Sequence, residues 1–580
     1  MCGISGISGK NWNSRQLKNM LAIQRHRGPD DEDIYISDDQ LTGLAHNRLS
    51  IIDLSEAGRQ PMHDLSGRYY MVFNGEVYNY LEIRKKLSAE FTFKSQSDSE
   101  VILYAYIKWG SACLDQFVGM FAIAIWDTHE KLLWIARDRF GVKPLNYAFD
   151  ANNNFYFASE IKTLHAGGIP KEINEPAWAA YLGYGRYDHD ENTFWKGVNK
   201  LMPGHFLTLK DNNFKITKWY DLHDKTGDEY DNRSIEDVSE EYLTLLEENI
   251  KFRFRSDVPV GINLSGGLDS SALLSLVNKV KGEDSDVIAF TFYTGDSRYD
   301  ELPWVREMIS HTNHPLISCL LQATDVPELA ASVQYHQDEP FGGIPTLAYA
   351  KLFEEARKEG VIVLLDGQGM DEQWAGYDYY RNVETNISRP TIQGSNDRSV
   401  LPECLDNEFL AMSGNWKAPE KYPDKLRNLQ YRDALYTKIP RALRFNDRIS
   451  MRASTELREP FLDHRLFEIA FRQQASFKIN GTTGKWFMRQ LLKNYLPGKV
   501  VEAPKRALQT PQREWLRKDL RNWAEAQIEN AINNVSFLNR NEVIKHWEAF
   551  LNEESDNSFY VWQWISLGLM EIKQPAKVLV

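Results

Sequence analysis

Cysteine is scarce in this sequence, with 4 residues in a chain of 580. The four, which are Cys2, Cys113, Cys319 and Cys404, show neither the spacing of a disulfide framework nor that of metal ligands. Long apolar runs are missing too, because no stretch approaches the roughly 18 residues that a membrane-spanning helix needs. The first residues contain no basic segment followed by an apolar one, so we expect no signal peptide. These absences predict a reduced, cytoplasmic protein.

Clusters of positive charge are also absent. Lys and Arg number 68 against 81 Asp and Glu, and the formal net charge is -13. Nucleic-acid binding needs a basic face that neutralises phosphates, so we expect no nucleic-acid partner, and no membrane partner either. Hydrophobic residues make up 42% of the chain, which is the composition of an ordinary globular protein. A chain of this length should form two to four domains.

Residues 1–222 are rich in predicted strands. Short apolar or alternating runs, several bounded by Gly, Asn or Asp, predict strands at 69–73, 120–126, 132–136 and 155–158. Helical periodicity predicts helices near 14–25, 79–88 and 98–109. Sheets with covering helices indicate an α+β layered domain.

A different pattern follows residues 223–234, which are polar and unpatterned and which we expect to form a linker. Nearly continuous apolar runs predict strands buried on both faces at 260–264, 287–293 and 361–365. Helical stretches separate these strands, which indicates an α/β doubly wound domain with a parallel sheet over 235–580. Its last part, from about residue 400, should be largely helical, and 383–400 should form a mobile loop.

Cys2 is the first residue with a clear chemical meaning. Because the residue behind Met1 is small, Met1 should be removed, and Cys2 would then carry a free α-amino group. Such an amine has a pKa of roughly 7.7–8.0, so near neutral pH it can accept the proton of the adjacent thiol. Nucleophile and base then belong to one residue. A second-position cysteine can also be incidental, so its neighbours decide between the two interpretations.

Four sequence blocks accompany Cys2, namely Arg25–Asp30 (RHRGPD), His46–Asp53 (HNRLSIID), Phe73–Asn79 (FNGEVYN) and Ser97–Glu100 (SDSE). In content and order they resemble the glutaminase half of asparagine synthetases, which are class II glutamine amidotransferases and N-terminal nucleophile hydrolases. The resemblance implies an αββα sandwich in which Cys2 attacks the side-chain amide of glutamine.

The same resemblance implies roles for five further residues. Asn74, through its side-chain amide, and Gly75, through its backbone N–H, would hold the oxyanion. Arg48 would bind the glutamine α-carboxylate, for which a planar guanidinium is the natural partner. Asp98, helped by Glu76, would bind the α-ammonium. The alternatives are a surface arginine at position 48 and an Asn-Gly hairpin turn at positions 74 and 75.

A second constellation follows the strand predicted at 260–264. It reads Leu264-Ser265-Gly266-Gly267-Leu268-Asp269-Ser270-Ser271 and precedes a helical stretch at 272–280. Gly and Ser at a helix N-terminus present backbone N–H groups to an anion, and the Gly-Lys-Ser/Thr ending of a Walker A loop is missing. The string resembles the pyrophosphate loop of the ATP pyrophosphatases, which cleave ATP to AMP and pyrophosphate. The alternative is a solvated helix cap at Asp269.

The resemblance to asparagine synthetases extends to about residue 515, through the blocks at 458–464 and 484–486. The ATP-binding residues that it implies are Leu264, Ser265, Gly266, Gly267, Asp269, Ser270, Ser271, Phe292, Asp366, Gly367 and Lys485. Phe292 would border the adenine, and Lys485, unless it is a surface lysine, would neutralise phosphate charge. Asp269 and Asp371 would hold Mg²⁺. A homodimer is usual for the family, and residues 559–572 should form a packing helix.

The implied reaction has two halves. Glutamine hydrolysis at Cys2 releases ammonia, and the second domain adenylates a carboxylate with MgATP. Ammonia then passes through an internal channel, because in water it would become unreactive ammonium, and it displaces AMP to form an amide. In asparagine synthetases the acceptor is the side chain of aspartate.

Two departures from the family pattern leave the acceptor open. The loop at 366–372 reads DGQGMDE, where relatives usually have S-G-E-G-x-D-E, so the catalytic position of their Glu is taken by Gln368, which cannot accept a proton. Residues 341–346 also lack the Arg of the family's T-T-I-R-A. We expect an asparagine synthetase. The alternatives are the same reaction on a sugar uronate or a secondary-metabolite acid, and a non-catalytic, ligand-sensing relative of the fold.

Overall fold

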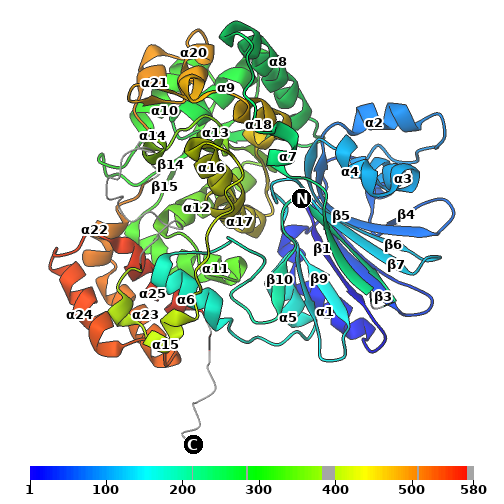
Figure 1. Ribbon diagram of the computed structural model, residues 1–580, viewed down its shortest axis with the longest axis horizontal. Helices are drawn as coiled ribbons and strands as arrows, with labels where there is room; N and C mark the ends of the chain where they lie inside the picture. The colour runs from blue at the N-terminus through cyan, green and yellow to red at the C-terminus, as the bar shows by residue number, and fades with distance from the viewer. Residues whose placement is uncertain (212, 283–284, 382–398, 506–508, 571, 573–580) are drawn as a thin grey trace, which may run out of the picture.

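The computed structural model describes residues 1–580 except 212, 283–284, 382–398, 506–508, 571 and 573–580. The predicted mobile loop at 383–400 therefore lies almost wholly outside the described residues. Two parts stand side by side, with the strands of the amino-terminal part on the right of Figure 1 and the carboxyl-terminal part on the left. Among the residues described, no helix is long and apolar enough to cross a membrane.

Two six-stranded antiparallel sheets build the amino-terminal part. The first has the order β10 (Val198–Lys200), β8 (Asn146–Phe149), β9 (Phe155–Ala158), β1 (Gly3–Ser8), β3 (Thr42–Arg48), β2 (Asp31–Ile36). The second has the order β12 (Asn213–Lys218), β11 (His205–Lys210), β7 (Leu132–Arg137), β6 (Gly119–Asp127), β5 (Tyr69–Val77), β4 (Met62–His63). The strands predicted from alternating runs are thus β5, β6, β7 and β9.

Apolar side chains from both sheets fill the space between them, among them Ile4 of β1, Val72 of β5 and Ile135 of β7. Helices α2 (Tyr80–Leu87) and α3 (Asp98–Trp109) cover the outer face of the second sheet. Helices α1 (Ser14–Ile23) and α5 (Ile161–Ala166) cover the first. The predicted helix–sheet–sheet–helix sandwich is confirmed.

The carboxyl-terminal part contains a five-stranded sheet whose described pairs are all parallel. Its order is β15 (Leu316–Leu320), β14 (Ala289–Tyr293), β13 (Val260–Asn263), β16 (Val363–Leu365), β17 (Glu456–Arg458). The chain moves outward in one direction from β13 to β15 and then returns to the other side of β13. Such a reversal places loops at the carboxyl ends of β13 and β16 beside a crevice where α/β proteins bind ligands.

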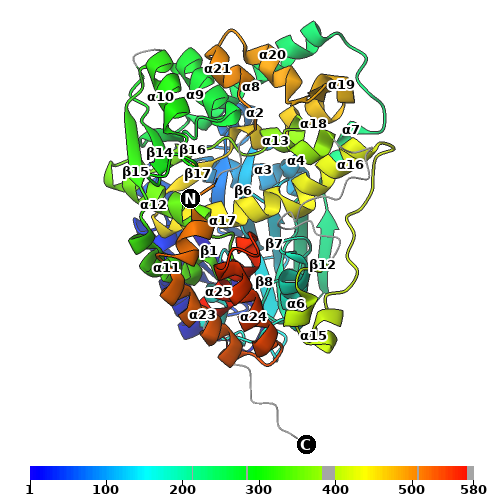
Figure 2. The same cartoon turned by 90° about the vertical axis from the view of Figure 1, so that its left-hand side faces the viewer.

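Helices cover both faces of the parallel sheet, as the continuous apolar runs predicted. Leu365 packs toward α8 (Ile235–Arg253), α9 (Leu268–Lys281) and α10 (Leu302–Thr312). Its neighbour Leu364 packs with α12 (Ile344–Lys358) and α17 (Ile439–Arg452). Figure 2 shows α9 and α10 above β14–β17, and α11 (Val326–Gln337) and α12 below them. Successive residues of one strand therefore enter different cores.

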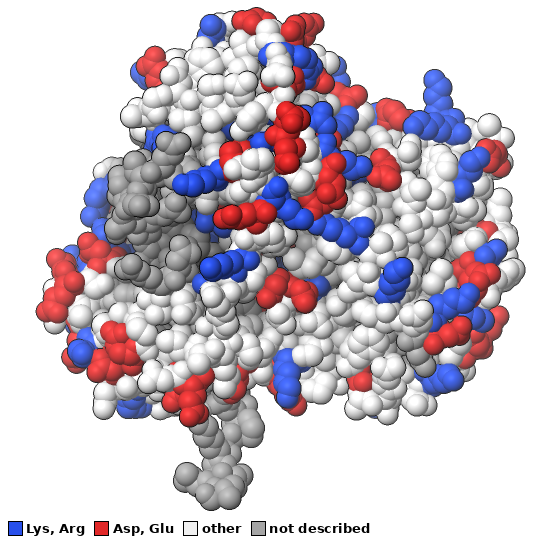
Figure 3. Space-filling view, in the orientation of Figure 1, with Lys and Arg blue, Asp and Glu red and all other residues white. Residues whose placement is uncertain are grey.

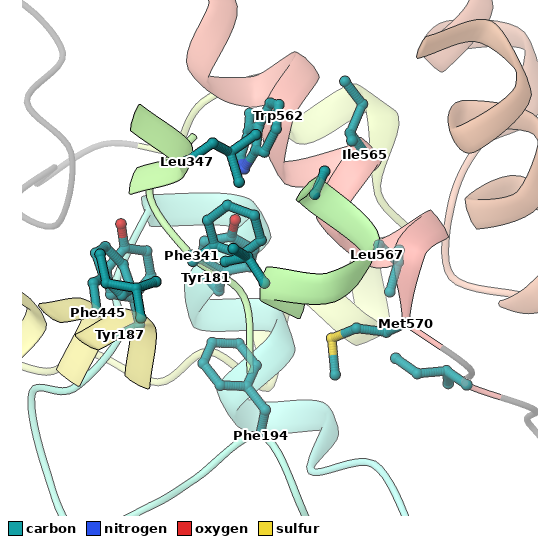
Figure 4. Close-up of a cluster of buried hydrophobic side chains, with 14 of the residues drawn as sticks. Tyr181, Tyr187, Phe194, Phe341, Leu347, Phe445, Trp562, Ile565, Leu567 and Met570 are labelled. Carbon is teal, nitrogen blue, oxygen red and sulfur yellow. The ribbon is translucent and has the colours of Figure 1, made fainter. Parts of the chain in front are cut away.

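A shared hydrophobic core joins the two parts. Helix α6 (Glu175–Tyr184) of the amino-terminal part packs near α25 (Ser558–Leu569), the packing helix predicted at 559–572. The ring centroids of Tyr181 and Phe194 lie 5.5 Å apart, as do those of Phe341 and Trp562, and Figure 4 shows the four residues in one cluster. The expected linker is partly helical, since α7 (Leu222–Thr226) reaches into it. The shared core restrains how the two parts sit relative to each other.

The shared core provides a stability test with two leucines. Leu567 of α25 is fully buried, whereas Leu65 is 61% exposed. We expect Leu567→Ala to lower the free energy of unfolding by about 2–5 kcal/mol because it leaves a cavity. Leu65→Ala should change it by less than about 0.5 kcal/mol. Chemical denaturation of both variants measures the difference, and equal effects would contradict the assignment of α25 to the core.

Candidate active sites

The predicted glutaminase residues come from four elements that meet at one end of the sandwich. Cys2 directly precedes β1, Arg48 ends β3, Asn74 and Glu76 lie on β5, and Asp98 begins α3. The Cys2 backbone N–H donates to Asn74 Oδ1 at 2.9 Å, and the Val77 N–H donates to Asp98 Oδ2 at 2.9 Å. These bonds connect the nucleophile to the second sheet, and that sheet to α3.

Asn74 presents a free donor. Its Oδ1 is engaged by Cys2, but its Nδ2 is buried and makes no hydrogen bond with any described group. A buried donor without a partner costs about 1–3 kcal/mol, so its position next to the nucleophile indicates a ligand. An oxyanion formed at Cys2 is the ligand that this N–H would receive.

Gly75 continues β5 and faces β6, where it pairs with Phe121. Its φ is +150°, and a Cβ atom there would lie 2.0 Å from the carbonyl oxygen of Met120. Only glycine fits that backbone. The Asn-Gly pair therefore lies inside a nine-residue strand, and the alternative interpretation as a hairpin turn is wrong.

The Cys2 thiol is protonated more firmly than a free one in this chain. Burial raises its pKa, while the positive terminal amine, the Leu49 backbone and Arg48 act in the opposite direction. The amine here belongs to Met1 and donates to Glu456 Oε2 at 3.0 Å. The Met1 side chain is buried against Val363 and other residues of the carboxyl-terminal part. Activation of the thiol by its own α-amine consequently requires the expected removal of Met1.

Arg48 and Asp98 are the charged groups that could bind the α-carboxylate and the α-ammonium of an amino acid. Arg48 is buried, and its guanidinium donates to the carbonyl oxygens of Ser55 (2.8 Å) and Asp53, which excludes a surface arginine. Burial raises the pKa of Asp98 to about 6, helped by the negative charge of Glu456 and opposed by the Val77 N–H. An ammonium group bound beside Asp98 would favour its ionised form.

Glu76 has a partner that the sequence did not predict. Arg458 Nη2 lies 3.3 Å from Glu76 Oε1, and Arg458 also pairs with Glu456, all three side chains being buried. Arg27, from the first block, likewise joins Cys2 to the other part of the molecule. Its Nε donates to the Cys2 carbonyl at 3.1 Å, and its other nitrogens bind both oxygens of Asp447. The only sequence signal was that both arginines lie in blocks shared with the family.

A cavity of about 950 Å³ opens at the carboxyl ends of β13 and β16. Its wall includes the predicted ATP-binding residues Ser265, Gly267, Asp269, Ser270, Asp366, Gly367 and Lys485, together with Gln368 and Asp371. Leu264 and Phe292 line a smaller adjoining cavity of about 20 Å³, with Tyr349 at the wall of both. Ser271 is buried in α9 and lines neither cavity.

The predicted pyrophosphate loop connects β13 to the N-terminus of α9. Gly266 has φ +73°, and a Cβ there would meet the Trp304 side chain at 2.7 Å. Ser265 and Ser270 face each other with hydroxyl oxygens 3.1 Å apart. The loop therefore turns sharply and leaves the first backbone N–H groups of a 14-residue helix beside the cavity, which is the arrangement that binds phosphate.

Four charged side chains meet at the wall of this large cavity. Lys485 Nζ lies 2.5 Å from Asp269 Oδ1 and 2.5 Å from Asp371 Oδ1, and Lys505 also pairs with Asp371. Although burial acts to raise it, the two lysines hold the pKa of Asp371 well below its usual range. Burial raises the pKa of Asp269 in spite of Lys485. The two alternative interpretations, a solvated helix cap at Asp269 and a surface lysine at position 485, are therefore wrong.

Asp269 and Asp371 satisfy the needs of a Mg²⁺–nucleotide complex. Mg²⁺ is usually held by one or two carboxylates, substrate phosphates and water rather than by a cage of protein ligands. The described part of the chain has no group of three or more His, Cys, Asp or Glu residues that could hold a metal. The residues present fit a metal ion that arrives with ATP.

Comparison with known proteins agrees with the geometry of both sites. Residues 1–220 match the model of the glutamine amidotransferase domain, and residues 241–573 match the model of the asparagine synthase family. The chain belongs to the asparagine synthase family. The match covers more than half of the chain, and it includes the parallel sheet and the loops around the large cavity.

Individual relatives cover nearly the whole chain. The glutamine-hydrolysing asparagine synthetase 1 of Bacillus subtilis is 26% identical, over 97% of this chain and 95% of that protein. A putative asparagine synthetase of Mycobacterium tuberculosis is 30% identical, over 87% and 86%. An amidase of Penicillium rubens is 29% identical, over 89% of both. The same two-part architecture therefore serves relatives with different names.

Asn74→Ala tests the oxyanion donor of this family member. The change removes a hydrogen bond made mainly to charge that develops in the transition state, so we expect the glutaminase kcat to fall by roughly 10²–10³. The KM for glutamine should change much less. Asn152→Ala, at an exposed turn, is the matched control and should leave both constants unchanged. A loss below about fivefold in Asn74→Ala would show that the side chain has no catalytic part.

The pKa of Asp98 predicts how glutamine use depends on pH. As the pH falls through about 6, this carboxyl becomes protonated and neutral and loses its attraction for the glutamine ammonium. The kcat/KM for glutamine should therefore decrease below pH 6. Asp98→Asn should lower kcat/KM at pH 8 by about 10–100-fold, the value of a hydrogen bond to a charged group, and should flatten the profile near pH 6.

Asp115→Asn serves as the control for that profile, because Asp115 is exposed on the same domain. This variant should follow the unmodified protein at every pH. An unchanged inflection near pH 6 in Asp98→Asn would assign it to another group.

Proposed function

We propose that this protein is a glutamine-dependent asparagine synthetase. It hydrolyses glutamine at Cys2 and uses the ammonia to convert aspartate, activated by ATP, into asparagine, with glutamate, AMP and pyrophosphate as the other products. The observation that carries the proposal is the pairing of two preorganised sites in one rigid molecule. The free amide donor of Asn74 lies beside a cysteine, and a phosphate-binding helix terminus opens into a large cavity.

In the glutaminase half, we assign each substrate group to one side chain. The Cys2 thiolate, after proton transfer to its α-amine, attacks the amide carbon of glutamine. Asn74 Nδ2 and the Gly75 N–H stabilise the oxyanion. Arg48 binds the α-carboxylate in a charge-assisted fork, and Asp98 binds the α-ammonium. Glu76 is paired with Arg458 and connects the two parts, and burial raises its pKa well above the usual range, so we assign the negative charge of the ammonium pocket to Asp98.

In the synthetase half, ATP occupies the large cavity with its phosphates over the N-terminus of α9. The backbone of Ser265, Gly266 and Gly267 cradles the phosphates, and Lys485 compensates their charge as the acyl-adenylate forms. Bound Mg²⁺ would neutralise phosphate oxygens from a position near Asp269 and Asp371. Phe292 and Leu264 lie at the adjoining small cavity, where the adenine would find apolar contacts.

Ammonia should reach the adenylate through the interior of the protein, where it stays unprotonated.

We also propose a cytoplasmic homodimer without nucleic-acid partners. On the face in Figure 3, Lys and Arg are interspersed with Asp and Glu rather than gathered in one basic patch. The four cysteines are free and buried, which suits a reducing compartment.

The alternative to aspartate as the acceptor is a different carboxylic acid, such as a sugar uronate or a secondary-metabolite acid. The neutral Gln368 at the wall of the cavity and the relatives that are named amidases favour it. The length of the match to proteins named asparagine synthetases favours aspartate. The chemistry of both sites is the same for either acid.

An acceptor assay decides between them. Protein given glutamine, MgATP and aspartate should release pyrophosphate and make asparagine in equal amounts, measured by amino-acid analysis. Asp269→Asn should lose both products but keep glutaminase activity, because Asp269 lies in the other site. Asp519→Asn, an exposed change in the same domain, should keep all three. Glutaminase activity without asparagine would reject aspartate as the acceptor, and a screen of other acids would then follow pyrophosphate release.

A further inference from the structure

Glu459 is a buried carboxylate that the roles described above leave unexplained. It directly follows β17 and precedes a short 3-10 helix, Pro460–Leu462. Its side chain is 4% exposed, and neither carboxylate oxygen makes a hydrogen bond with any described group. Burial of an unpartnered carboxylate is costly, so such a group is retained where it interacts with something that the free protein does not contain.

Backbone pairing places Glu459 next to the loop at 366–372. Strands β16 and β17 are neighbours, and the Asp366 N–H donates to the Arg458 carbonyl at 2.9 Å. The first residue of that loop is therefore bonded to the residue before Glu459. The charge of Asp366 raises the pKa of the Glu459 carboxyl, and the Gln368 backbone N–H lowers it as a weak donor whose geometry falls short of an ordinary hydrogen bond. Glu459 thus lies next to the position where relatives carry a glutamate.

Its other neighbours come from the side of the glutaminase domain. Lys143 and Arg253 are the cations that act on Glu459. Lys143 belongs to the amino-terminal part, is buried, and approaches the Leu457 carbonyl at 3.4 Å. Glu459 is consequently placed between Lys143 at the domain junction and the loop at 366–372, whose Gln368 lines the nucleotide cavity.

Four other carboxylates, on the loops at 264–271 and 366–372, are already engaged. Lys485 lies between Asp269 and Asp371. Asp366 accepts from the Gly367 N–H at 2.6 Å, and Glu372 accepts from the Tyr377 hydroxyl at 2.8 Å. Among these five acidic residues of the described chain, only Glu459 has both oxygens without a hydrogen bond or an ion pair.

The amide-forming step needs a proton acceptor. When the ammonia nitrogen forms a bond to the acyl carbon, that nitrogen carries three hydrogens and a positive charge. The carbon–oxygen bond to AMP breaks with its electron pair on the phosphate oxygen, and one proton must leave the nitrogen to give a neutral amide. Removal of that proton from the tetrahedral adduct also prevents the nitrogen from leaving again, so it commits the adduct to amide formation. Gln368 has no basic atom for this purpose.

We propose that Glu459 takes this proton and so supplies the carboxylate that the 366–372 loop lacks. The inference rests on the proposed amidotransferase function but not on the identity of the acceptor acid. Burial, together with the charge of Asp366, raises the pKa of Glu459 well above its usual range, while Lys143 and Arg253 act to lower it. A carboxylate with a raised pKa is a stronger base than one in water, which suits general base catalysis near neutral pH.

Glu459→Gln is the direct test, because it preserves shape and removes the basic oxygen. Glutaminase activity and the first-turnover burst of pyrophosphate should stay within about threefold of the unmodified protein. The rate of amide formation should fall by roughly 10²–10⁴, the usual contribution of a general base. Glu468→Gln is the matched control. Burial also raises the pKa of Glu468, but its carboxylate accepts from Tyr220, so amide formation should not change.

Three further variants separate a chemical role of Glu459 from a structural one. Gln368→Glu alone should keep amide formation within about tenfold, a barrier change of about 1.4 kcal/mol or less. Gln368→Glu combined with Glu459→Gln should restore amide formation to within about tenfold of the unmodified protein. The glutamate at position 368 then supplies the carboxylate that the change at position 459 removes. Glu459→Asp should retain more amide formation than Glu459→Gln.

Three results would overturn the proposal. Amide formation by Glu459→Gln within threefold of the unmodified protein would show that the carboxylate is not needed. A double variant as inactive as the single one would make Glu459 a structural group, as would equal losses in Glu459→Asp and Glu459→Gln. If the unmodified protein makes no amide from any acid, the amidotransferase function itself fails. That outcome is distinct from normal amide synthesis by Glu459→Gln, which rejects only the role of Glu459.

Discussion

Arg458 connects the two active sites through charges that water does not reach. It stands at the end of β17, pairs with Glu456 on the same strand, and lies 3.3 Å from Glu76 on β5 of the sandwich. Arg27 makes a similar connection from the Cys2 carbonyl to Asp447 of α17. Removing one partner of such a buried pair typically costs about 3–5 kcal/mol. The glutaminase site therefore includes groups from the synthetase domain and cannot move independently of it.

This rigidity suits a reaction whose intermediate is ammonia. An ammonia molecule released into water becomes ammonium, so the second site must stand at a defined distance from the first. The aromatic core around Tyr181 and Trp562 (Figure 4) restrains the far side of the junction. The ion pairs restrain the side nearest Cys2.

Each site keeps polar groups that only substrates can complete. The amide nitrogen of Asn74 and the carboxylate of Glu459 are buried without partners, at a cost that the surrounding fold must offset. The nucleotide cavity differs, because Lys485 and Lys505 there compensate Asp269 and Asp371. Phosphates can replace those carboxylates as partners of the lysines. Preorganised charge at both sites keeps reorganisation during the reaction small.

Motif blocks and apolar runs were enough to predict the αββα sandwich and the parallel sheet, and they also named most of the candidate residues. Alternating and continuous apolar runs report one-sided and two-sided burial, and the blocks around Cys2 and Asp269 are local in sequence. The sequence did not determine that Asn74 and Gly75 lie within a strand, because that depends on the approach of β6. Nor did it reveal that Arg458 pairs with Glu76, or that the Glu459 carboxylate is buried without an ion pair. Those are contacts between segments some 90 to 380 residues apart, and only the tertiary structure decides which side chains such segments bring together.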